Sequence, residues 1–236
     1  MQQKIDIENI KQKIFEKLEP SGWGKIFKSF IYSSDFENIL KKLVSETKEG
    51  KRFTPSLKDM FKAFEECPYD KLKVVMVGQD PYPYLGIADG IAFSCSKNEN
   101  IQPSLEQIFN EINNTVYTSE NQKLDPNLKR WSNQGVLMLN TALTTNVGKT
   151  GTHYKIWQPF IAYLFDYLTW HNNGLVYVYM GKVAQEWADC VNDNNYKFYL
   201  SHPASAAYTN TNWNSENVFN NINKIIKDNY NEIITW

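Results

Sequence analysis

The first seventy residues place apolar side chains at the spacing of amphipathic helices. These positions are Ile7, Ile10, Ile14 and Leu18, then Phe36, Ile39, Leu40, Leu43 and Val44, and then Leu57, Met60, Phe61 and Phe64 after Pro55. Apolar residues that recur every three or four positions line one side of a helix. The pattern therefore predicts a helical N-terminal portion.

Beyond residue 70 the pattern changes to short apolar runs separated by further helical sets. The runs are Lys73–Val77, Val136–Leu139, Leu175–Met180 and Tyr196–Leu200, and helical spacing recurs around residues 105–112, 160–168, 183–191 and 218–226. Strands that alternate with helices predict an α/β fold, with a central four-stranded parallel sheet flanked by helices on both faces. No linker interrupts the chain, so we expect residues 1–236 to form a single domain whose first fifty residues are helical.

Polar side chains follow each predicted strand. Asp80 follows the first run, Asn140 the second, Gly181-Lys182 the third and His202 the fourth. In open parallel sheets, ligands bind at the carboxyl ends of the strands. We therefore expect a carboxylate, an amide, a glycine-lysine turn and an imidazole to meet at one edge of the sheet.

The composition excludes several classes of protein, but it gives no sign of a nucleic-acid partner. The net charge of −1 and the pI near 6.3 mean that a DNA partner would need a local basic face. The three cysteines and three histidines show no disulfide or metal-ligand spacing, so we expect no metal and no cofactor. The N-terminus lacks the apolar core of a signal peptide, and no run approaches the ~18 apolar residues of a membrane span. We expect an intracellular protein, cytoplasmic or, in a eukaryotic or viral setting, nuclear.

Each candidate residue also has an ordinary structural interpretation. An Asp before Pro opens turns, a residue before Pro is held extended, and Ser-x-x-Gln is a capping box at the start of a helix. These interpretations apply to Asp80, His202 and Ser104 with Gln107, while Asn140, Lys182, Tyr82 and Phe93 have plain strand-end, turn or packing roles. The joint placement at four strand ends favours a functional site over separate coincidences.

The residue types restrict the chemistry that such a site performs. No Ser-His-Asp or Cys-His arrangement and no phosphate-binding Gly-rich loop is evident, which disfavours acyl and phosphoryl transfer. An aspartate facing a histidine and an amide suits a reaction with a cationic sugar and an anionic leaving base. The carboxylate orients water, and the imidazole and amide hydrogen-bond the departing base.

A series of motifs resembles the family 1 uracil-DNA glycosylases from about residue 50 to the end. The motifs are Gly78–Tyr82, Gly90–Ser94, Pro103–Leu105, Gln134–Thr141 with Leu143-Thr144, Thr152-His153 with Trp157, Gly181–Gln185 and Ser201–Pro203, with Phe53–Pro55, Trp131 and Trp236 as further matches. The resemblance is weaker in residues 1–50. It implies a monofunctional DNA N-glycosylase that flips uracil from DNA and hydrolyses its N-glycosidic bond in base excision repair. It also implies a monomer, uracil-containing DNA as partner, and a DNA-mimicking inhibitor protein as a second partner.

The resemblance assigns a role to each candidate residue. Asp80 would activate the attacking water, and His202 would hydrogen-bond the uracil oxygen. Asn140 would read the base edge, and Phe93 would stack on the base. The remaining assignments are Tyr82 as the barrier to the thymine methyl, Gln79 as a further base contact, and Ser104, Gly181, Lys182 and Ser205 as contacts to the DNA backbone.

Two departures from the family pattern stand out. Pro83 occupies a position where the family usually has histidine, and the loop after His202 lacks the leucine that wedges into the duplex. Counting from His202 places Ala206 at the wedge, with Ala207 in the same loop, and counting back from Tyr208 places Ser205 there. Neither Ala206 nor Ser205 is a wedge. Since extrusion costs least for an unpaired base, we predict a preference for single-stranded DNA, with Tyr208 as an alternative wedge.

Three other functions remain open at this point. A glycosylase for a 5-substituted uracil is opposed by Tyr82, whose ring would block the substituent. A DNA-binding scaffold without catalysis is opposed by the retained Asp80, Asn140, Phe93 and His202. A nucleosidase for free nucleosides is opposed by the residues that resemble backbone contacts.

Overall fold

A four-stranded parallel sheet forms the centre of the molecule. The computed structural model describes residues 6–96 and 101–236. The sheet has the strand order β3-β2-β5-β6, with strands β2 (Val74–Gly78), β3 (Val136–Asn140), β5 (Val176–Met180) and β6 (Tyr196–Leu200). Every neighbouring pair is parallel. Each strand lies within one residue or so of its predicted apolar run, which confirms the predicted sheet.

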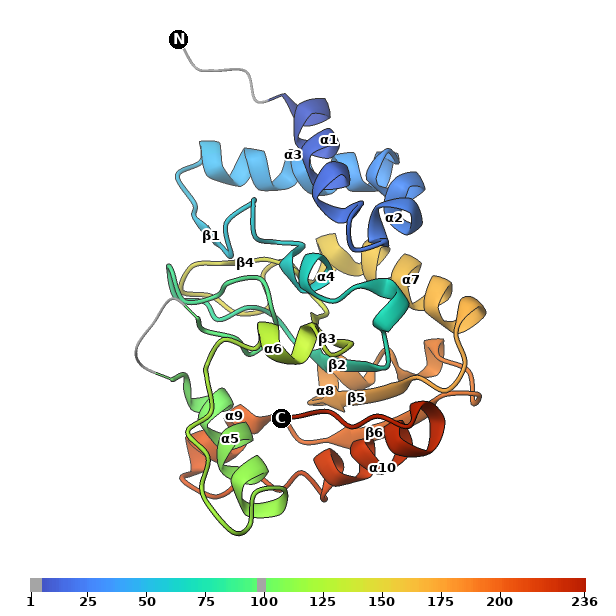
Figure 1. The fold of residues 1–236 in the computed structure, drawn as a ribbon. Coiled ribbons are helices and arrows are strands. Elements are labelled where there is room, and N and C mark those ends of the chain that lie inside the picture. Colours follow the sequence, from blue (N-terminus) through green and yellow to red (C-terminus); the bar gives the residue numbers. More distant parts are fainter. Residues whose placement is uncertain (1–5, 97–100) are drawn as a thin grey trace.

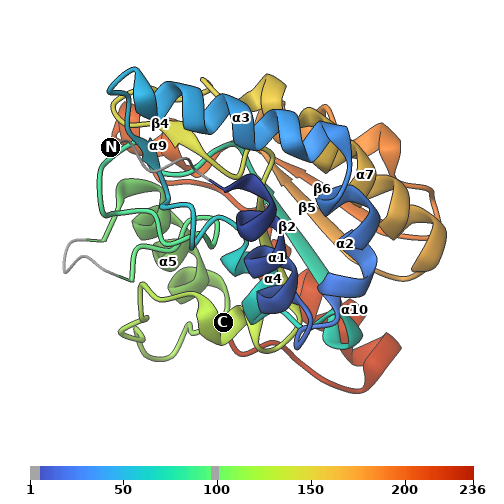
Figure 2. The same cartoon turned by 90° about the horizontal axis from the view of Figure 1, so that it is seen from above.

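Helices cover both faces of this sheet, as Figures 1 and 2 show. One face carries α1 (Ile7–Leu18), α2 (Trp23–Ile31), α3 (Ser34–Lys48), α4 (Lys62–Glu66), α7 (Tyr154–His171) and α8 (Lys182–Gln185). The other face carries α5 (Pro103–Thr115), α6 (Lys129–Ser132), α9 (Pro203–Thr209) and α10 (Val218–Tyr230). Two short 3-10 helices, η1 (Tyr69–Lys71) and η2 (Ala188–Cys190), complete the helical elements of the described chain.

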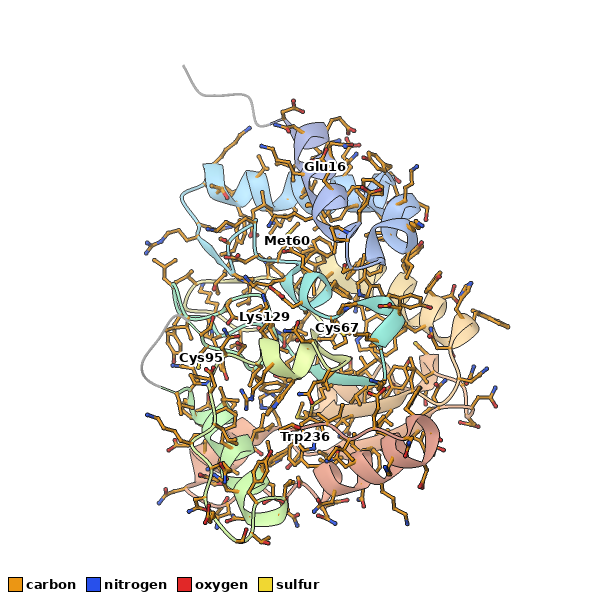
Figure 3. The ribbon with its side chains drawn as sticks, in the orientation of Figure 1. Glu16, Met60, Cys67, Cys95, Lys129 and Trp236 are labelled. Carbon is orange, nitrogen blue, oxygen red and sulfur yellow. The ribbon has the colours of Figure 1, made fainter. Side chains whose placement is uncertain are left out.

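Alternate residues along β2, β3 and β5 supply two separate cores. In β2, Val75 and Val77 pack beneath the N-terminal helices and α7, whereas Val74 and Met76 pack against α5 and α10. This alternation is the period of two that a pleated strand imposes. Trp236, labelled in Figure 3, belongs to the second core. Its ring centroid lies 5.0 Å from that of Phe219. Burial on both faces explains why β2, β5 and most of β3 are apolar, whereas the edge strand β6 is partly exposed and contains Lys197.

The structure corrects the predicted helix around residues 57–64. Only Lys62–Glu66 is helical, because the N–H of Ala63 donates to the carbonyl of Gly90 (3.2 Å) and not to the preceding turn. The hydroxyl of Ser56 donates to the Asp59 carboxylate (2.8 Å), which favours a turn before α4. The apolar residues there face the core from turns.

Three further elements differ from the sequence prediction. The single helix expected over residues 183–191 is divided into α8 and η2, because the N–H of Trp187 donates to the Ala184 carbonyl three residues back. Helix α2 was not predicted as a separate element. Strands β1 (Phe53–Thr54) and β4 (Thr145–Asn146) form a small antiparallel pair outside the main sheet. The sequence pattern did not predict this pair, because neither strand lies in an apolar run. In the described part of the chain, no helix is long and apolar enough to cross a membrane.

Candidate active site

A cleft of about 360 Å³ opens at the carboxyl ends of the strands. Its lining residues are Gln79, Asp80, Pro81, Tyr82, Pro83, Phe93, Ser104, Asn140, Thr150, His202, Ala204, Ser205 and Tyr208. The structure thus brings together the predicted catalytic pair, the four predicted base-binding residues and two of the predicted backbone contacts. The topology explains this convergence, because β2, β3 and β6 all end at this edge.

Gly78 allows two of these side chains to approach the backbone of β2. The register pairs Gly78 with Asn140 at the ends of β2 and β3. A Cβ at Gly78 would lie 2.9 Å from Oδ1 of Asn140 and 3.0 Å from Cε2 of Phe93, so a larger residue here would displace both side chains. Phe93 itself has a φ of 64°, an uncommon backbone conformation for a residue with a side chain. Strain of this kind is typical of functional sites.

The carboxylate of Asp80 is held by the segment that precedes α7. Its Oδ2 accepts the backbone N–H of Gly151 (2.6 Å), and its Oδ1 accepts the hydroxyl of Tyr154 (3.3 Å). Burial raises the pKa of Asp80, while hydrogen bonds from Gly151, Thr145 and Tyr154 act in the opposite direction. The carboxylate is therefore fixed in orientation and more basic than an exposed aspartate.

His202 carries a neutral ring at the opposite strand end. Its Nδ1 accepts the backbone N–H of Ala204 (3.1 Å). Burial lowers the pKa of His202 to about 4. A neutral ring whose Nδ1 is an acceptor bears its proton on Nε2, which leaves one N–H donor for a ligand. The ring centroid lies 5.7 Å from that of Phe93.

Tyr82 and Ser104 form the wall next to Phe93. The Tyr82 hydroxyl donates to the carbonyl of Phe93 (3.0 Å), and burial raises the Tyr82 pKa well above its usual value. Ser104 lowers the Tyr82 pKa, against the larger effect of burial. The phenol ring is therefore fixed in the cleft and does not swing freely.

Gln79 connects the end of β2 to neighbouring segments. Its backbone carbonyl accepts the hydroxyl of Thr141 (2.8 Å) and the N–H of Ala142 (3.0 Å). Its side-chain Oε1 accepts the hydroxyl of Tyr154 (3.5 Å). Asn140 differs, since its side-chain amide makes no hydrogen bond to the described residues and lines the cleft with its donor and acceptor available.

The predicted capping box at Ser104 is wrong. Helix α5 begins at Pro103 with Gln102 as its N-cap, so Ser104 is the second residue of the helix and is buried. The Oε1 of Gln107 accepts the backbone N–H of Trp213 (2.9 Å) and does not return to the helix start. Proline prefers the first helical position, which explains the earlier start.

The predicted wedge loop after His202 is also corrected. Residues Pro203–Thr209 form α9, with His202 as the N-cap. Ala206 is buried in the core where α9 packs on α5, and the half-buried Ala207 lies outside the lining of the cleft. Ser205 donates its hydroxyl to the carbonyl of His202 (2.7 Å). Tyr208, by contrast, is 88% exposed at the rim of the cleft.

Two of the residues that were predicted to contact the DNA backbone, Gly181 and Lys182, lie outside the lining of the cleft. Gly181 is buried behind it, where a Cβ would lie 3.0 Å from Cβ of His202. Lys182 begins α8 and is exposed. Conversely, sequence reasoning gave no role to Gly151 or Tyr154, which hold Asp80. The matched pair Thr152-His153 was the only signal near them.

A buried chain of polar contacts anchors the segment that holds Asp80. Nε2 of His153 contacts Oε2 of Glu46 (2.8 Å), and its Nδ1 contacts the hydroxyl of Thr144 (2.8 Å). Nε1 of Trp157 donates to that same hydroxyl (2.8 Å). Glu46 belongs to α3, so the N-terminal helices contribute to the support of the site. Among the described residues, no cluster of His, Cys, Asp or Glu is placed to hold a metal ion.

Known proteins share both the sequence and the fold. The model of the uracil DNA glycosylase superfamily matches residues 64–227. Uracil-DNA glycosylase 1 of Listeria innocua is 34% identical over 203 residues, which cover 84% of this chain and 89% of that protein. The crystal structure of mimivirus uracil-DNA glycosylase has a TM-score of 0.81 at 28% identity, over 94% of this chain and 88% of that one. A variant of the mimivirus protein in complex with UGI has a TM-score of 0.81 at 28% identity, over 91% and 87% of the two chains. The chain belongs to the uracil-DNA glycosylase superfamily.

Proposed function

We propose that this protein is a uracil-DNA glycosylase that hydrolyses the N-glycosidic bond of uracil in DNA and leaves an abasic site for base excision repair. One observation carries the proposal: the half-buried carboxylate of Asp80 and the neutral imidazole of His202 line the same cleft. The membership of the chain in the superfamily agrees with this chemistry.

The two groups act on opposite ends of the bond that breaks. The C1′–N1 bond of the deoxyuridine cleaves, and its electron pair passes to the base, where charge gathers on the uracil oxygens. The N–H on Nε2 of His202 stabilises that charge by donating a hydrogen bond. Asp80 stabilises the sugar cation, orients the water that attacks C1′ and accepts its proton.

Base selection depends on the groups between these two. Asn140 offers both a donor and an acceptor, which match the N3–H and O4 of uracil and mismatch cytosine. Phe93 provides the stacking surface, and Gln79 provides a further contact to the base. Tyr82, held by its bond to the Phe93 carbonyl, excludes a 5-methyl group and with it thymine. These contacts favour uracil over the 5-substituted bases.

Residues at and near the rim of the cleft are placed to contact the DNA backbone and to fill the gap that the extruded base leaves in the duplex. We assign Ser104, Ser205 and the Gly181-Lys182 turn to the backbone, and Tyr208 to the gap that the extruded base leaves. Because α9 directs Ala206 into the core, a short aliphatic wedge is missing. Extrusion from a duplex is then costly, and single-stranded DNA is the favoured substrate.

We infer that the first fifty residues belong to the same domain as the site. Support comes from the Glu46–His153 contact and from helix α3, which packs on α7. The protein is expected to act as a monomer. A DNA-mimicking inhibitor would occupy the same cleft rim, and the complex of the mimivirus relative with UGI supports testing this partner.

The test is uracil release from a labelled oligonucleotide, followed by alkaline cleavage at abasic sites. The single-stranded oligonucleotide and a U·A duplex are compared, with a thymine oligonucleotide and free deoxyuridine as controls. We expect uracil release from both uracil-containing DNA substrates, faster from the single strand, and no release of base from the thymine oligonucleotide or from free deoxyuridine. No abasic sites in either DNA would overturn the function, and equal rates would overturn the strand preference.

A further inference from the structure

Tyr154 makes a contact to Asp80 that lies outside the motifs of the site. Its hydroxyl is 3.3 Å from Oδ1 of Asp80 and 3.5 Å from Oε1 of Gln79. The two residues are 74 positions apart in the sequence. Tyr154 is the first residue of α7, and its ring is half-buried against the core beneath the N-terminal helices.

The start of α7 is held rigidly, so the tyrosine hydroxyl has a defined position. His153, the N-cap residue, is fully buried between Glu46 and Thr144. Gly151, three residues before Tyr154, has a φ of 73° and donates its N–H to the other oxygen of Asp80. A Cβ at Gly151 would lie 3.2 Å from Cε2 of Tyr154, so the turn and the ring also pack together.

We propose that Tyr154 is a positioning residue for the reaction, whose hydroxyl keeps the Asp80 carboxylate ionised and aimed at the attacking water. The inference rests on the proposed function. Pro83, which lines the same cleft, has no side-chain donor, and its carbonyl accepts the N–H of Gly148 (2.7 Å). The hydrogen bonds to the Asp80 carboxylate come from the start of α7 and the turn before it, namely from the hydroxyl of Tyr154 and the N–H of Gly151.

The electrostatics agree with a donor role. Asp80 lies in a desolvated position that raises its pKa, and the Tyr154 hydrogen bond lowers it. The pKa of Tyr154 is raised by burial and by the charge of Asp80, so the phenol stays protonated and donates. Of the other titratable groups nearby, His153 beside α7 lowers the Asp80 pKa, and His202 lines the same cleft. Loss of the phenol hydroxyl should leave Asp80 harder to ionise.

The test compares Tyr154→Phe with Tyr163→Phe on single-stranded uracil DNA. Tyr163 lies on the same helix, is also half-buried, and its hydroxyl donates to the carbonyl of Ile26, far from the cleft. A hydrogen bond to a charged group is worth enough that Tyr154→Phe should lower kcat about tenfold or more, with KM changed less than about twofold. The acid limb of the kcat profile should move to higher pH in Tyr154→Phe and stay in place in Tyr163→Phe.

A carbon NMR titration of the Asp80 carboxyl group gives a readout that needs no activity. Its pKa should be higher in Tyr154→Phe than in the unmodified protein and unchanged in Tyr163→Phe. Equal pKa values, or a kcat loss without movement of the acid limb, would overturn the role of Tyr154. An unmodified protein that releases no uracil would overturn the proposed function instead, and the titration would still decide whether the contact exists.

Discussion

The backbone N–H of Ala204 donates to Nδ1 of His202 at 3.1 Å, two residues along the chain. This bond exists because His202 is the N-cap of α9, where the side chain accepts an otherwise unpaired N–H of the first turn. The same bond fixes the tautomer of the ring and directs its remaining proton on Nε2 toward the cleft. A helix cap thereby determines which hydrogen bond the site offers to a leaving base.

His202 should therefore stay neutral across the working pH range. Its pKa is lowered to about 4 by burial, below the unfolded value near 6.5. Between these values the unfolded state binds more protons, so this residue makes stability fall as pH drops from about 6.5 toward 4. Nitrogen NMR should show the Nε2–H tautomer down to about pH 5. In His202→Gln, the acid-induced loss of stability in this window should shrink; a protonated ring at pH 6 would contradict the assignment.

Replacement of Asp80 by Asn should remove most turnover but preserve DNA binding. The amide keeps the size of the side chain yet cannot accept the proton of water or stabilise a sugar cation. We expect kcat to fall by about 10²- to 10⁴-fold, with the dissociation constant for uracil DNA little changed. Single-turnover kinetics together with fluorescence anisotropy would measure both quantities. A variant that retains more than a tenth of the rate would remove Asp80 from its assigned role.

Truncation of Tyr82 to Ala should open the cleft to a methyl group. The ring is fixed by its bond to the Phe93 carbonyl, so its loss leaves space where the 5-methyl of thymine would lie. Release of thymine from an ordinary oligonucleotide should become detectable. The control is Tyr117→Ala, since the Tyr117 hydroxyl donates to the Trp236 carbonyl away from the cleft. If thymine is still refused, another group excludes the methyl.

A change of Asn140 to Asp should shift the base preference toward cytosine. The side chain lies over Gly78 and is free to meet a base, and a carboxylate replaces its donor by an acceptor. We expect uracil release to fall by about 10²-fold or more, because the N3 and O4 pattern is no longer matched. Competition between uracil and cytosine oligonucleotides measures the ratio. An unchanged ratio would show that Asn140 does not read the base edge.

Replacement of Tyr208 by Ala should affect the two forms of DNA differently. The ring is 88% exposed at the rim, where it can fill the gap in a duplex stack. The variant should lose about tenfold on a U·A duplex and stay near the original rate on a single strand, because an unpaired base needs no replacement partner. Tyr230→Ala, on the distant α10, serves as the control. An equal loss on both substrates would mean that Tyr208 binds the backbone instead.

The sheet and the core of the site were predictable from the chain alone. Apolar runs marked the four strands, and the rule that ligands bind at their carboxyl ends selected Asp80, Asn140 and His202. The structure places all three in one cleft. The sequence pattern sufficed here because β2, β3 and β5 are buried on both faces and the long helices are buried on one.

The elements that were missed lack such a signal. Helix α9 is built of Pro203, small residues and Tyr208, so it shows no apolar stripe, and the proline at its first position was the available clue. Ser104 was placed at a helix start by a local motif, but the preceding proline began the helix earlier. Tyr154 reaches Asp80 only through the tertiary fold, which no spacing rule encodes.

The contact between Glu46 and His153 has a consequence for how much of the chain the enzyme needs. Glu46 lies ahead of residues 64–227, the part that the superfamily model matches. A protein trimmed to residues 64–227 would keep every residue that lines the cleft. The buried imidazole of His153, however, would lose Glu46, the only carboxylate that it contacts among the described residues. The part of the chain that the superfamily model matches is therefore shorter than the part that supports the cleft.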